Sequence, residues 1–219
     1  MGIDMIKLIR SSMIIMGFMA VANAASAGGD AAKGEKLTAV CSSCHGADGN
    51  SATSMFPKLA GLGEKYIAKQ LADIKSGERP VPEMTGLLDA MNAQDMADIG
   101  AFYSAKSMQL SGAKDFQVQV NSGAKVNALE LGQKIYRAGN AETGVAACTG
   151  CHSPTGMGNA PAGFPRLSGQ YAEYIEKQLK AFRAGDRVND GEAMIMRLVA
   201  KNMSDAEIKA VANYIAGLN

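Results

Sequence analysis

A short motif of cysteine and histidine occurs twice in this chain, and no other property of the sequence limits its fold as much. Cys41-Ser-Ser-Cys44-His45 recurs as Cys148-Thr-Gly-Cys151-His152. The two copies account for all 4 cysteines and both of the 2 histidines in the 219 residues. Self-similarity over a long period indicates a duplicated structural unit. The sequence therefore predicts two related domains, each built around one copy of the motif.

The repetition extends beyond the motif. Phe-Pro-Lys-Leu at 56–59 aligns with Phe-Pro-Arg-Leu at 164–167, and Tyr-Ile-Ala-Lys-Gln-Leu at 66–71 aligns with Tyr-Ile-Glu-Lys-Gln-Leu at 174–179, at the same offset. We therefore expect an N-terminal domain over residues 28–112, a C-terminal domain over residues 128–219 and a linker over residues 113–127.

The pattern within each half is helical. Apolar residues recur every three to four positions over 66–74 and 174–182, and Gly77 and Gly185 follow as helix stops. Capping-box patterns precede the last helix of each half, at Asn92 with Asp95 and at Ser204 with Glu207. Strand-like alternation is limited to Phe116, Val118 and Val120. The predicted fold class is all-α, with an extended linker between the two domains.

The motif itself indicates a cofactor. Two cysteines separated by two residues and followed by histidine place two sulfurs and one imidazole on the same side of a helical turn. This is the attachment signature of c-type haem, in which each cysteine forms a thioether and the histidine is the proximal iron ligand. Two haem c groups are expected, held by Cys41, Cys44 and His45 and by Cys148, Cys151 and His152. The halves are small and only 5% of the chain is aromatic, so a porphyrin would also complete each core.

Other uses of the cysteines fit less well. A thioredoxin-like redox pair does not require the adjacent histidine and normally lies beside strands. A zinc site made from all four cysteines would have to join Cys44 to Cys148, a whole domain away. A disulfide across two intervening residues closes too short a loop to stabilise the fold appreciably.

The second axial ligand of each iron is expected to be methionine, because both histidines are used as proximal ligands. The chain has 14 methionines, and the repeat discriminates among them. The spacing from Met84 to Met91 equals that from Met196 to Met203, so Met84 and Met196 occupy matching positions and are the expected ligands. Met194 has no counterpart in the first half and remains the alternative for the second haem.

The Nδ1–H of each proximal histidine needs an acceptor that fixes the ring. A carbonyl near Pro57 or Pro165 is the candidate in each half. The sequence leaves open the alternative that these prolines only shape a loop.

The N-terminus has the features of an export signal. Lys7 and Arg10 precede an apolar run over 13–22, and Ala-Asn-Ala at 22–24 and Ala-Ser-Ala at 25–27 offer cleavage sites. The apolar run is shorter than the roughly 20 residues of a spanning helix. Residues 1–27 are therefore expected to be a signal peptide cleaved after Ala24 or Ala27, which places the protein in the periplasm. An uncleaved membrane anchor is the alternative.

Taken together, the two motifs, the Phe-Pro-Lys/Arg-Leu segments, the Tyr-Ile-x-Lys-Gln-Leu helices and the late methionines resemble the di-haem cytochrome c4 family, over essentially the whole mature chain. The resemblance implies two tandem class I cytochrome c-like domains that face each other across a pseudo-twofold interface. It also implies a carrier of single electrons from a quinol:cytochrome c reductase type of donor to a terminal oxidase type of acceptor. By position, it assigns Met84 and Met196 as axial ligands, and Pro57 and Pro165 as the histidine acceptors.

The expected function is electron transfer without catalysis, by a monomer that can associate peripherally with a membrane. With 22 Lys+Arg against 21 Asp+Glu, there is no basic excess to suggest nucleic acid. A di-haem peroxidase is the enzyme alternative, but it needs acid–base residues and the chain has no spare histidine. A ligand-binding sensor or the haem subunit of a dehydrogenase is the third possibility.

Overall fold

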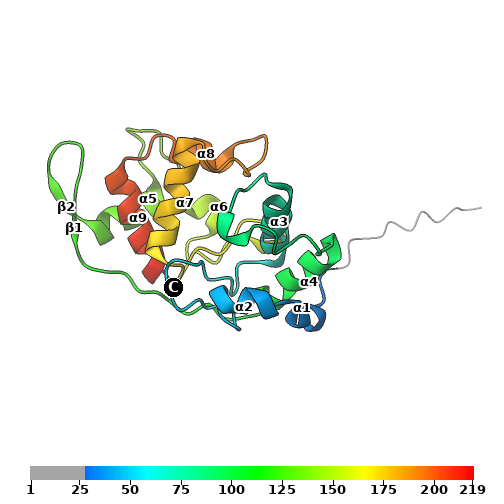
Figure 1. Ribbon diagram of the computed structural model, residues 1–219. Coiled ribbons are helices and arrows are strands. Elements are labelled where there is room, and N and C mark those ends of the chain that lie inside the picture. The colour runs from blue at the N-terminus through cyan, green and yellow to red at the C-terminus, as the bar shows by residue number, and fades with distance from the viewer. Residues whose placement is uncertain (1–27) are drawn as a thin grey trace, which may run out of the picture.

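The computed structural model describes residues 28–219, so the expected signal peptide at 1–27 lies outside the described residues. Two helical halves lie next to each other, with the first half running from blue to green and the second from green to red (Figure 1). The N-terminal half contains α1 (Ala31–Leu37), α2 (Ala39–His45), α3 (Glu64–Ser76), the 3-10 helix η1 (Pro82–Met84) and α4 (Ala93–Ser104). The C-terminal half contains α5 (Ala128–Ala138), α6 (Thr149–His152), the 3-10 helix η2 (Ala160–Ala162), α7 (Ala172–Ala184), α8 (Ile195–Ala200) and α9 (Asp205–Gly217). The prediction of an all-α chain with two tandem domains is confirmed.

Each half is organised by a close crossing of its first and last helices, α1 with α4 and α5 with α9. A glycine lies at each crossing. A Cβ atom on Gly34 would lie 2.0 Å from the Asp98 carbonyl oxygen, and one on Gly132 would lie 2.2 Å from the Ala210 carbonyl oxygen. The backbones therefore approach more closely than any larger residue allows, and this brings the two ends of each domain together.

The predicted helix ends are confirmed. Gly77 and Gly185 end α3 and α7 in the left-handed conformation, with φ of 84° and 82°, which glycine adopts without steric cost. Both capping boxes form, each satisfying backbone N–H groups of the first turn. They start α4 at Asn92 and α9 at Ser204.

The linker differs from the expected extended segment, because part of it folds as a β-hairpin. β1 (Gln117–Gln119) pairs antiparallel with β2 (Lys125–Asn127), with Val118 opposite Val126. Val118 is buried against Ala128 and Ala210, so the alternation at this point marks a half-buried strand. The hairpin lies beside α5 and α9 at the far end of the C-terminal half (Figure 1).

The segment before the hairpin is also bound to the C-terminal half. The backbone N–H of Ser111 donates to the Gly169 carbonyl, and that of Gly112 donates to the Ala216 carbonyl. Asn213 both accepts from and donates to the Lys114 backbone. The linker is thus fixed along α9. No helix in the described part of the chain has the length and apolar character needed to cross a membrane.

Candidate haem sites

The first motif lies on α2, which places its cysteines one helical turn apart with the histidine next to the second. Cys41 is half-buried and Cys44 is exposed, while His45 is buried. The Nδ1–H of His45 donates to the Pro57 carbonyl oxygen at 2.8 Å. This bond fixes the ring and leaves Nε2 free of its proton. Burial lowers the pKa of His45, which favours the neutral imidazole that binds metals.

The second motif repeats this geometry at α6. Cys148 is the N-cap of the helix, and Cys151 and His152 lie in it. The Nδ1–H of His152 donates to the Pro165 carbonyl oxygen at 2.9 Å, and burial lowers the pKa of His152 as well. An aromatic ring borders each histidine: Phe56 is 6.1 Å from His45 and Phe164 is 6.2 Å from His152, between ring centroids.

The first cysteine of each motif, Cys41 or Cys148, has the environment of a sulfur that packs rather than of a redox catalyst. Burial raises the pKa of Cys41, and it raises the pKa of Cys148 to about 11. A catalytic pair has the opposite property, a lowered pKa that produces the thiolate. Within residues 28–219 all four cysteines are free, and no three potential ligands among His, Cys, Asp and Glu gather at one point.

A cavity of about 1510 Å³ connects the two motifs. Most small-molecule pockets have about 300–1,000 Å³, so this cavity has room for more than one ordinary ligand. Residues of both halves line it, including all four motif cysteines and both histidines. A large apolar cavity with two sulfurs and one imidazole at each site fits a pair of covalently attached porphyrins.

The methionines selected by the repeat also line this cavity. Met84 ends η1 and packs against the N-terminal core, and Met196 lies in α8 and packs against the C-terminal core. Met194 does not line the cavity. It is the N-cap of α8, with φ of 47° and a side chain that is 41% exposed.

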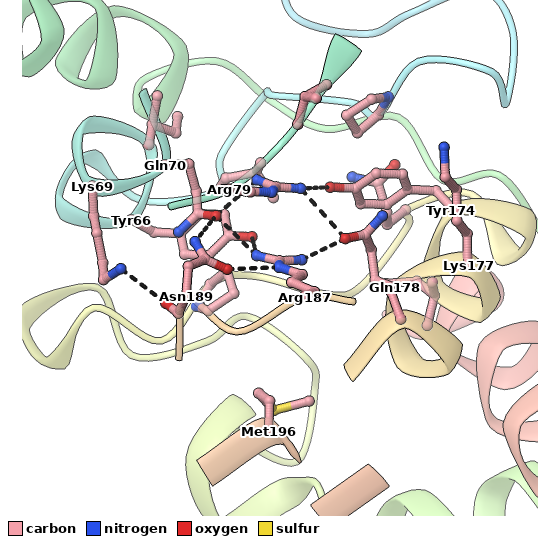
Figure 2. A pocket seen from close by; sticks show the side chains of 18 of the residues that line it. Tyr66, Lys69, Gln70, Arg79, Tyr174, Lys177, Gln178, Arg187, Asn189 and Met196 are labelled. Atoms are coloured by element: carbon pink, nitrogen blue, oxygen red, sulfur yellow. Dashed lines mark hydrogen bonds between the residues drawn. The ribbon is translucent and has the colours of Figure 1, made fainter. Parts of the chain in front are cut away.

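Where the halves meet, six polar side chains form a pseudo-symmetric set that we call the interface ring: Tyr66, Gln70 and Arg79 with Tyr174, Gln178 and Arg187. Arg79 donates to Gln70 in its own half and to Tyr174 and Gln178 in the other half (Figure 2). Arg187 donates to Gln178 in its own half and to Tyr66 and Gln70 in the other half.

The interface ring has a property that bears on the cofactor. Neither Arg79 nor Arg187 forms an ion pair within the described residues, although Arg187 is buried. Both line the cavity. Guanidinium groups held by neutral acceptors beside a cavity suit a ligand that brings carboxylates, as haem does with its propionates.

The interface ring was not among the site residues predicted from the sequence. The signal was present, because all three residues of one half recur in the other at the same offset. The tyrosine and glutamine of each half lie on α3 or α7, and the arginine follows that helix. Polar residues that recur in both copies are candidates for a contact between the copies.

Comparisons with known proteins agree with this geometry. The family model "Cytochrome c" matches residues 31–104 and 129–219. Cytochrome c4 of Azotobacter vinelandii is 46% identical, covering 97% of this chain and 99% of that protein. The crystal structure of reduced recombinant cytochrome c4 from Pseudomonas stutzeri superposes with a TM-score of 0.80 at 46% identity, over 87% of this chain and 100% of that one.

A more distant relative is named by its partner. The thiosulfate dehydrogenase electron acceptor of Stutzerimonas stutzeri strain A1501 is 38% identical, covering 81% of this chain and 78% of that protein. With the duplicated fold and two equivalent sites, these matches show that the chain belongs to the cytochrome c4 family, whose members carry electrons rather than catalyse reactions, and that it holds two covalently bound haem c groups.

Proposed function

We propose that each half, 28–112 and 128–219, uses its own motif to hold one haem with histidine and methionine as axial ligands. Cys41 and Cys44, and likewise Cys148 and Cys151, form the thioethers. His45 with Met84, and His152 with Met196, are the ligand pairs. The observation that carries this proposal is that each histidine donates Nδ1–H to a proline carbonyl, so that Nε2 remains for the iron in a cavity that a methionine of the same half also lines.

The ligand pair determines what the site does. Bound haem c supplies an iron that takes up and releases one electron. A thioether favours the ferrous state, and two protein ligands close the metal to external ligands. The side chains of Met84 and Met196 thus restrict each site to electron transfer. The Pro57 and Pro165 carbonyls keep the histidine rings in place as the charge on the metal changes.

For the biological setting we propose a periplasmic monomer that accepts electrons from a quinol:cytochrome c reductase type of donor and delivers them to a terminal oxidase type of acceptor. The export signal at 1–27, cleaved after Ala24 or Ala27, supports the location. The name of the thiosulfate dehydrogenase electron acceptor supports a second type of donor, a sulfur-oxidising dehydrogenase. Peripheral contact with the membrane would shorten the path between membrane-bound partners.

The proposal is tested by measuring the mass of the mature protein and its pyridine haemochrome spectrum, which together give the first residue and the number of covalent haems. The unsubstituted protein is expected to begin at Ala25 or Gly28 and to carry two haems. The double substitution Cys148→Ala with Cys151→Ala is expected to leave one covalent haem, and Cys41→Ala with Cys44→Ala is the matched variant for the other half. Two covalent haems in either double variant would refute the assignment of the cysteines.

A further inference from the structure

The peptide group between Pro57 and Lys58 connects the first histidine to the opposite half of the molecule. Its carbonyl oxygen accepts the Nδ1–H of His45 at 2.8 Å. Its N–H, which belongs to Lys58, donates to Oε1 of Gln170 at 3.0 Å. One peptide thus links the His45 imidazole to a side chain of the C-terminal half.

Gln170 is held firmly in this position. Its Nε2 donates to the Lys58 carbonyl oxygen at 2.9 Å, and its Oε1 also accepts from the Tyr171 N–H at 3.1 Å. Gln170 is only 2% exposed and Lys58 only 3%. The Lys58 ammonium binds the Gly169 carbonyl at 3.2 Å and the Ser111 hydroxyl at 2.8 Å. The peptide is therefore clamped between the halves and shielded from water.

The second half has no such connection. His152 donates to the Pro165 carbonyl in the same way, but in the described part of the chain the Arg166 N–H has no protein acceptor. The residue that matches Gln170 in the repeat is Leu62, which packs in the N-terminal core. The duplication is thus broken at one position, and only the first histidine is linked across the interface.

Hydrogen bonds in a chain strengthen one another, because a peptide whose N–H is bonded has a more negative carbonyl oxygen. A stronger acceptor on Nδ1–H gives the imidazole more anionic character, and this stabilises ferric iron. We propose that Gln170 is a positioning residue that lowers the reduction potential of the N-terminal haem from across the interface, and so makes the two haems unequal. The inference rests on the proposed role of His45 as proximal ligand.

The test is a redox titration of the haem-loaded Gln170→Leu variant, with NMR detection of the two histidine Nδ1 protons. At a fixed potential, the ratio of reduced to oxidised haem in the N-terminal half is expected to rise about two-fold. This equals about 18 mV, at 59 mV per tenfold change for a one-electron couple. The NMR signal of the His45 Nδ1 proton should move upfield. The signal of the His152 Nδ1 proton and the reduction potential of the C-terminal haem should not change.

Two further variants make the result specific. Tyr171→Phe removes a 2.6 Å bond across the interface, from the tyrosine hydroxyl to the Ser51 carbonyl, without touching the Pro57–Lys58 peptide. This variant should change neither the reduction potential of either haem nor the signals of the two histidine Nδ1 protons. Gln170→Glu places a stronger, anionic acceptor at the Lys58 N–H, so the His45 proton should move downfield. This variant tests the proposal by itself if the leucine variant does not fold.

Unchanged His45 signals and potentials in both Gln170 variants, with two haems present, would overturn the inference and leave the proposed function intact. Equal shifts at both haems, or a comparable shift in Tyr171→Phe, would also overturn it, since general loosening of the interface would then be the cause. Failure of the proposed function itself would be visible beforehand, as fewer than two covalent haems in the unsubstituted protein.

Discussion

At the scale of single residues, the proposed function depends on the side-chain sulfurs of two methionines, Met84 and Met196. Met84 ends a short 3-10 helix whose first residue is Pro82, and its side chain packs on the N-terminal core. A rigid segment of this kind holds the sulfur at a fixed place in the cavity. The exchange of a methionine for alanine therefore removes a ligand without removing a helix.

Met84→Ala is expected to change the N-terminal haem only, to a form with a lower reduction potential that binds external ligands. Without the soft ligand, the reduction potential of the N-terminal haem should fall by on the order of 0.1 V, within the roughly 0.8 V that axial ligands span. The reduced variant should also bind carbon monoxide at one iron. Potentiometric titration and a carbon monoxide difference spectrum measure both effects. Two unchanged potentials would exclude Met84 as a ligand.

Met196 and Met194 provide a matched pair in the second half. Met196 lines the cavity, whereas Met194 is 41% exposed at the start of α8. Met196→Ala is expected to lower the potential of the C-terminal haem and open it to carbon monoxide. Met194→Ala should change neither the reduction potentials of the two haems nor their carbon monoxide binding. The reverse pattern would assign the ligand to Met194.

At the scale of elements, local signals in the sequence predicted the helices well. The capping boxes at Asn92 and Ser204 and the glycine stops at Gly77 and Gly185 depend only on neighbouring residues, and they form as expected. The histidine motif is equally local, because its three functional residues share one helical turn. These features could be predicted because no distant residue is needed to form them.

Features that depend on distant residues could not be predicted in the same way. The hairpin at 117–127 buries Val118 on a surface formed by α5 and α9, which are distant in the sequence from at least one of its strands. Nothing in the sequence around Gln170 marks it, and its role is visible only from its contact with Lys58. Long-range contacts of this kind leave no periodicity in the sequence, and a repeat shows them only when both copies contain them.

The helix crossings yield a prediction about stability. Gly132→Ala would improve the helix propensity of α5 by about 1 kcal/mol. The new methyl group, however, would lie 2.2 Å from the Ala210 carbonyl oxygen, so α5 and α9 must separate. The overlap outweighs the propensity, and the net loss in the free energy of unfolding is expected to be about 3 kcal/mol.

Guanidinium chloride unfolding of the haem-loaded protein measures this loss. Gln133→Ala, at the exposed neighbouring position on α5, is the control and should change the free energy of unfolding by less than about 0.5 kcal/mol. A Gly132→Ala variant as stable as this control would show that the crossing tolerates a wider separation.

At the scale of the whole molecule, the interface ring is symmetric in sequence and asymmetric in its hydrogen bonds. Arg187 is 9% exposed, and it makes an extra bond of 2.9 Å from Nε to the Asn189 side chain. Asn189 in turn donates to Gln70 and to Asp73, whose carboxylate also pairs with Lys69. In the first half, the residue that matches Asn189 is Val81, which cannot make these bonds. Arg187 is therefore part of a larger hydrogen-bond network than Arg79.

The same substitution at the two related arginines measures this asymmetry. Arg187→Met removes four hydrogen bonds from a buried group and leaves the side-chain oxygen of Asn189 without its donor, so the free energy of unfolding should fall by about 2–3 kcal/mol. Arg79→Met removes three bonds, one of them 3.4 Å long, from a partly exposed group, and the loss should be about 1 kcal/mol. Denaturant unfolding of both haem-loaded variants gives the comparison. Equal losses would mean that Asn189 and its partners contribute nothing beyond the duplicated ring, and the interface would then be symmetric in energy as well as in sequence.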